Sequence, residues 1–90
     1  MGEKNLKDQY SFLEKQVNDY MQILLVKTPE QVIQYFEKRL KTYRAILEKQ
    51  EVYPESIILY VQHLISEHSL HLKRVEQYMK YQKENALYPI

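Results

Sequence analysis

Three residues whose side chains could bind a metal or transfer a proton, His63, Glu67 and His71, are spaced four apart within one helical pattern. Side chains at this spacing share one side of a helix, so they could converge on a metal ion or relay a proton. A metal site in a helical bundle also needs ligands from facing helices. The carboxylates of the two preceding segments mostly lie off the apolar seams, and those segments contain no histidine. We therefore expect a surface Glu/His cluster and no cofactor, with a metal or di-iron bundle as an alternative function.

His68 differs from the other two histidines because it falls within the apolar seam, between Ile65 and Leu72. One interpretation is a core imidazole bonded to a tyrosine hydroxyl or a carboxylate on a facing helix. The other is a pH-sensitive position, since charging a buried imidazole destabilises a fold. We favour the core imidazole.

Three segments must position these residues, and each repeats apolar residues at alternating spacings of three and four, which predicts amphipathic helices. We expect helices at about 5–27, 29–52 and 54–85, followed by a short tail, 86–90. Thr28, Pro29 and Gln31 predict a capping box at the second start, and Pro54 marks the third. The first seam is Leu6, Tyr10, Leu13, Val17, Tyr20 and Leu24. The second is Ile33, Phe36, Leu40, Tyr43 and Leu47, widened by Val32 and Ile46. The third is Ile58, Val61, Ile65, His68, Leu72, Val75 and Met79, widened by Ile57, Leu64, His71 and Tyr78.

The expected helices are separated by very short connections, and such connections force neighbouring helices to run antiparallel. Residues 1–90 are therefore predicted to form one all-α domain, an antiparallel three-helix bundle with coiled-coil-like heptad seams whose third helix is the longest. Gly2 is the one glycine of the chain. Phosphate-cradling loops, tight hairpins and Schellman caps favour glycine, so we expect few of these features.

The composition of the chain disfavours several classes of function. The chain has 13 Lys and Arg against 12 Asp and Glu, a net charge of +1, and no cysteine. This balance disfavours nucleic-acid binding, which stays an alternative through a basic face of the second helix, Lys38, Arg39, Lys41 and Arg44. Thiolate chemistry and disulfides are excluded, and the apolar runs are too short for a membrane span. We expect a cytoplasmic protein that is not an enzyme and takes no small-molecule substrate.

The third helix is expected to overhang its neighbours and to leave apolar side chains uncovered. Tyrosine, of which the chain has nine, and methionine are common in protein interfaces. We therefore predict a small regulatory or adaptor protein that binds another protein or a second copy of itself. The predicted anchors are Tyr78, Met79, Tyr81, Leu87 and Tyr88. A second surface is suggested by apolar residues off the seams, namely Phe12, Ile23 and Val26 on the first helix and Leu59 and Leu70 on the third, with Phe12 and Ile23 as the preferred pair.

Overall fold

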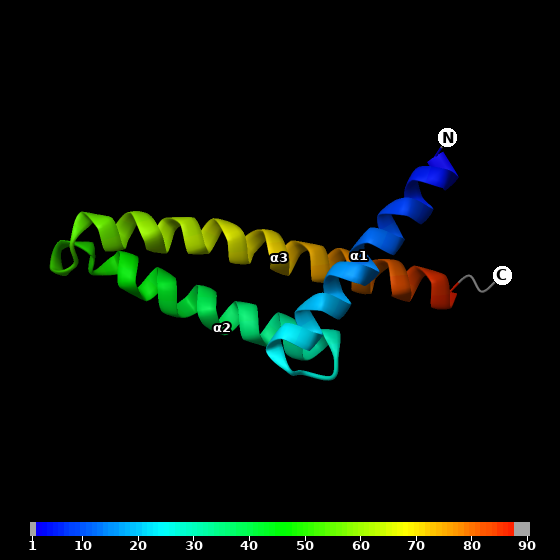
Figure 1. Cartoon of the computed structure of the whole chain (residues 1–90), viewed down its shortest axis with the longest axis horizontal. Helices are drawn as coiled ribbons and strands as arrows, with labels where there is room; N and C mark the ends of the chain where they lie inside the picture. Colours follow the sequence, from blue (N-terminus) through cyan, green and yellow to red (C-terminus); the bar gives the residue numbers. More distant parts are fainter. Residues whose placement is uncertain (1, 88–90) are drawn as a thin grey trace.

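The computed structural model describes residues 2–87, with side chains over 8–84. It consists of α1 (Gly2–Leu24), α2 (Pro29–Glu48), a short 3-10 turn η1 (Gln50–Val52) and α3 (Glu55–Leu87). The prediction of an all-α protein with three packed helices is confirmed. Figure 1 shows α2 and α3 running side by side in opposite directions, while α1 crosses α3 obliquely and its N-terminal end projects away from the pair. Thus α1 does not align with the other two helices as a regular bundle would require.

The first helix ends at Leu24, earlier than the expected residue 27, because Leu25 adopts a left-handed conformation with φ of 58°. The amide of Leu25 donates to the carbonyl of Gln22 (3.3 Å), and that of Val26 donates to the carbonyl of Met21 (3.0 Å). This pair of bonds is a Schellman motif, which usually places glycine at the left-handed position. The lack of glycine therefore did not prevent this cap, and a leucine fills the position.

The second helix begins with the predicted capping box. The amide of Gln31 donates to the Thr28 hydroxyl (3.3 Å), and the amide of Thr28 donates to Gln31 Oε1 (3.2 Å). Gln31 Oε1 also accepts from the amide of Lys27 (2.8 Å). These bonds satisfy main-chain donors that a helix start otherwise leaves unpaired.

The connection between α2 and α3 is longer than expected. The second helix ends at Glu48, not near residue 52, and the chain continues through η1 to an extended Tyr53. The carbonyl of Pro54 accepts from the amides of Ile57 (3.0 Å) and Ile58 (3.2 Å). Pro54 thus stands immediately before α3 instead of within its first turn.

The main core cluster lies where the three helices meet and consists of Leu13, Val17 and Tyr20 of α1, Val32 and Phe36 of α2, and Val75 and Tyr78 of α3. Leu40 of α2 and Ile58 and Val61 of α3 are buried outside this cluster. Val32 and Tyr78 are buried, whereas the expected seam residues Ile33 and Met79 are partly exposed. The oblique α1 accounts for this shift, because it packs against the flanks of α2 and α3 and encloses flanking positions.

The C-terminal part of α3 extends past α2, as expected (Figure 1), but α1 packs against it at Tyr78 and Tyr81. The ring of Tyr10 stacks on that of Tyr78 at 5.7 Å between centroids, and the Tyr81 hydroxyl donates to Gln9 Oε1 at 3.4 Å. The half of α3 that begins at Glu55 has only α2 beside it (Figure 1). The N-terminal half of α3 is therefore the part that α1 leaves uncovered.

Candidate protein-binding surfaces

The predicted anchors near the end of α3 have different environments. Tyr78 belongs to the core, and burial, with smaller contributions from Tyr10 and Glu14, raises the pKa of its hydroxyl. Met79 and Tyr81 are partly buried and pack against the core. The side chain of Leu87 and the whole of Tyr88 lie outside the described residues. Tyr78 is buried beneath Tyr10 of α1, and its role as an anchor stays a prediction.

A better surface lies at the other end of α3. Ile57, Leu64, His71 and Tyr78 are spaced seven apart and follow one side of this helix. His71 and Tyr78 contact α1, whereas Ile57 is 41% exposed and Leu64 is partly exposed. Tyr60, three residues after Ile57 and four before Leu64, is 60% exposed. We call Ile57, Tyr60 and Leu64 the distal face. The sequence shows the seven-residue repeat. It does not show at which residue of this repeat the contact with α1 ends.

A second surface is a hollow between α1 and α3. Its volume is about 330 Å³, and it brings together Phe12, Leu70 and Tyr81. Phe12 and Leu70 were expected on the surface formed by the off-seam apolar residues, and Tyr81 among the anchors. Ile23 and Leu59, which were expected on the same surface as Phe12, are exposed outside this hollow. Of the off-seam apolar residues, only Phe12 and Leu70 line the hollow.

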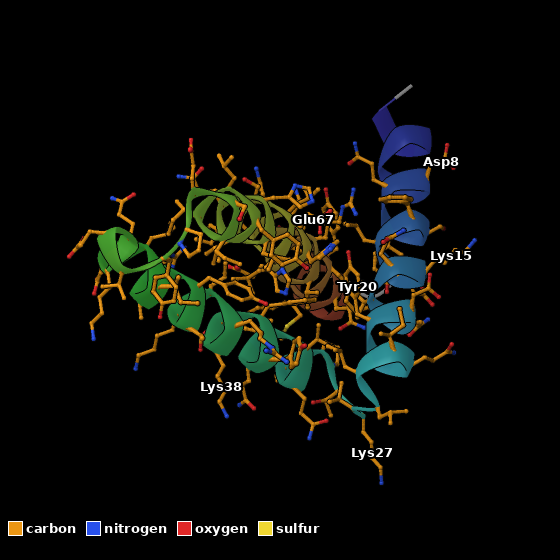
Figure 2. All side chains as sticks on the ribbon, turned by 60° about the vertical axis from the view of Figure 1, so that its left-hand side comes forward. Asp8, Lys15, Tyr20, Lys27, Lys38 and Glu67 are labelled. Carbon is orange, nitrogen blue, oxygen red and sulfur yellow. The ribbon has the colours of Figure 1, made fainter. Side chains whose placement is uncertain are left out.

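His71 of α3 contacts both other helices at their junction. Its Nδ1 lies 2.7 Å from the Tyr20 hydroxyl, and its ring packs against those of Tyr20 (5.0 Å) and Phe36 (5.5 Å). Figure 2 shows Tyr20 pointing from α1 toward the other helices. Burial, then the charges of Arg74 and His68, lower the pKa of His71, against an opposing effect of Glu67. The neutral imidazole is therefore the form that this junction favours.

His68 packs its ring edge-on between Phe36 (5.4 Å) and Tyr43 (5.3 Å). Its Nδ1 lies 2.9 Å from the carbonyl oxygen of Leu64, one turn earlier in its own helix. Because a carbonyl can only accept, Nδ1 carries the proton. The partner is therefore the main chain of α3 rather than the expected side chain on a facing helix, and His71 is the histidine that bonds to a tyrosine.

The spacing of His63, Glu67 and His71 does not produce a common site. His63 Nε2 and Glu67 Oε1 form an exposed pair at 3.1 Å, whereas Nδ1 of His71 lies beside Tyr20 at the helix junction. Within the described part of the chain, the structure shows no group of three histidine, aspartate or glutamate side chains positioned to hold a metal ion. The observed geometry thus gives the metal alternative no support.

The basic residues of α2 are exposed but do not form a continuous stripe. Arg39 stacks over the ring of Tyr35 (5.3 Å) and donates to its hydroxyl (3.2 Å), which raises the pKa of the guanidinium. Lys38 points away from the bundle in Figure 2. Helical spacing places Lys41 among the outward-facing carboxylates of α2, such as Glu37. This mixture of charges is a weak footprint for phosphate groups.

Comparison with known proteins adds no functional assignment. No protein-family model matches the chain, and no curated protein or solved structure matches it. None of the helices within residues 2–87 combines the length and hydrophobicity that crossing a membrane requires.

Proposed function

We propose that this protein is non-enzymatic and works by protein–protein contact, as a dimer formed through the distal face. One observation carries the proposal. The side of α3 that binds α1 through His71 and Tyr78 continues to Ile57 and Leu64, where α1 no longer covers it. A surface that packs a helix over half of its length is suited to pack another helix over the rest.

A second copy is the simplest occupant of this surface. A two-fold axis would bring two identical distal faces together, so each Ile57 and Tyr60 would be covered without a further chain. Tyrosine is frequent in the centre of interfaces because its ring buries a large area while its hydroxyl can keep a polar partner. The small core of a 90-residue chain also gains stability from association.

The experiment is sedimentation equilibrium of the wild type and of the double variant Ile57→Asp, Tyr60→Asp. We expect the wild type to dimerise as its concentration rises and the variant to remain monomeric with unchanged helicity by circular dichroism. Leu59→Asp is the matched control, because Leu59 is 59% exposed on the same helix but outside the distal face. A wild type that stays monomeric at high micromolar concentration, or a variant that dimerises like the wild type, contradicts the proposal.

A further inference from the structure

The hollow between α1 and α3 shares no residue with the distal face and offers a different chemistry. Both of its walls are helices, and residues of α1 and α3 alone line it. Leu13, which is buried, lies at its base, and Phe12 and Leu70 stand on opposite walls. Phe12 is 49% exposed and Leu70 is 48% exposed. Two large apolar side chains, each about half covered, thus border one concave space.

The polar lining of this hollow is positively charged. Lys73 and Arg74 contribute two cations, the other polar side chains are two glutamines and Tyr81, and no carboxylate is among the lining residues. The guanidinium of Arg74 lies 5.5 Å from the centre of the Phe12 ring. A cation held over an aromatic ring is stabilised by the ring electrons and has a fixed place beside the apolar wall.

We propose that this hollow binds an amphipathic helix of another protein, one that combines large apolar side chains with acidic residues. The apolar side chains enter between Phe12 and Leu70. Carboxylates one turn away on the same helix pair with Lys73 and Arg74. The charge of the lining selects an acidic partner, and the apolar walls require apolar anchors, so neither a purely acidic nor a purely apolar segment satisfies both.

A helix fits this hollow better than an extended strand. The walls offer side chains and no open sheet edge, so a bound strand would leave its main-chain groups without partners there. A helix satisfies its own main chain and presents anchors at positions three and four apart, which lie on one side. Its axis can follow the furrow between two crossing helices, as one helix packs against two others in a bundle.

The test is selection from a display library of helical peptides of roughly 15 residues, the length at which isolated helices become stable. One side of each peptide is randomised among apolar, acidic, basic and neutral polar residues. The bait is the full-length protein. We expect selected peptides to carry a large apolar residue with Asp or Glu three or four positions away, and their affinity to fall at least tenfold at high salt, because screening weakens their ion pairs.

Two variants establish the site. Phe12→Ala with Leu70→Ala should weaken the selected peptides at least tenfold, and Lys73→Glu with Arg74→Glu should instead select peptides rich in Lys and Arg. Lys15→Glu, a charge change on α1 outside the hollow, is the control and should leave binding unchanged. Circular dichroism and thermal melts check that each variant is folded.

Three results would overturn the inference. They are a selection that enriches no helical peptide, enriched peptides without acidic residues, and enriched peptides that bind the Phe12→Ala, Leu70→Ala variant as tightly as the wild type. Peptide binding by the distal-face variant distinguishes this site from self-association. A monomeric Ile57→Asp, Tyr60→Asp protein that still binds the selected peptides supports the hollow as an independent site.

Discussion

Removal of the Tyr20 hydroxyl by Tyr20→Phe tests the contact that fastens α1 to α3. Tyr20 is 9% exposed, and its hydroxyl bonds to His71 Nδ1 at 2.7 Å. A hydrogen bond of this kind contributes about 0.5–1.5 kcal/mol, and leaving a fully buried partner unpaired would add roughly 1–3 kcal/mol. His71 is only partly buried, so water can replace the hydroxyl and most of the second cost is avoided. We expect a loss of about 1 kcal/mol.

The assay is thermal and urea unfolding followed by circular dichroism. For a domain of this size, about 1 kcal/mol corresponds to a decrease of roughly 4–8 °C in melting temperature. The ring of Tyr20 also packs edge-on against Phe36 at 5.5 Å, and Phe at position 20 preserves that contact. A variant that melts at the wild-type temperature would show that the Tyr20–His71 bond does not hold α1 in place.

The same residue pair makes stability depend on pH. Because the folded state lowers the pKa of His71, the unfolded chain takes up a proton first as the pH falls below about 6.5. The contribution of His71 to the free energy of unfolding is therefore complete above that pH and is lost as the pH falls toward the folded-state pKa of His71. His71→Gln should reduce this decrease between about pH 8 and pH 5.5, whereas His63→Gln, at an exposed position, should retain it. Equal pH dependence in the wild type and both variants would refute the reasoning.

Two further predictions concern the core and the capping box. Leu40→Ala should lower the free energy of unfolding by about 2–5 kcal/mol, because Leu40 is 3% exposed, while Leu59→Ala on an exposed surface should cost far less. Urea titrations that rank Leu59 above Leu40 would contradict the placement of the core. Thr28→Ala should cost about 1 kcal/mol through loss of the bond to the Gln31 amide, and Thr28→Ser should restore it. Unchanged melting of Thr28→Ala would mean that the cap adds nothing to stability.

Local signals in the sequence were sufficient to predict that three helices form and that one of them begins with a capping box. The apolar spacing placed Leu13, Val17 and Leu40 in the core, and Thr28 with Gln31 gave the capping box, because both features depend on residues only a few positions apart. The end of α1 was missed since its cap uses Leu25 in a conformation that glycine normally adopts.

The candidate surfaces were less predictable, since they depend on the direction of α1. An antiparallel α1 would cover Ile57 and Leu64, and an oblique one instead covers Tyr78 and leaves a hollow beside Phe12. No short-range pattern encodes that choice. It follows from which distant side chains pair, such as Tyr10 with Tyr78 and Tyr20 with His71. The apolar residues could therefore be identified from the sequence, but not which of them share a surface.

The unequal sequence separation of the helix contacts has a consequence for how the chain folds. The α2–α3 hairpin closes through a short connection, whereas the Tyr20–His71 and Gln9–Tyr81 contacts join residues 51 and 72 positions apart. Closing longer loops costs more entropy and slows folding, so we expect the hairpin to form before α1 docks on α3. On the ribosome this order opposes the order of synthesis. Because α1 is made before α2 and α3, its apolar side stays uncovered until the end of α3 has been made.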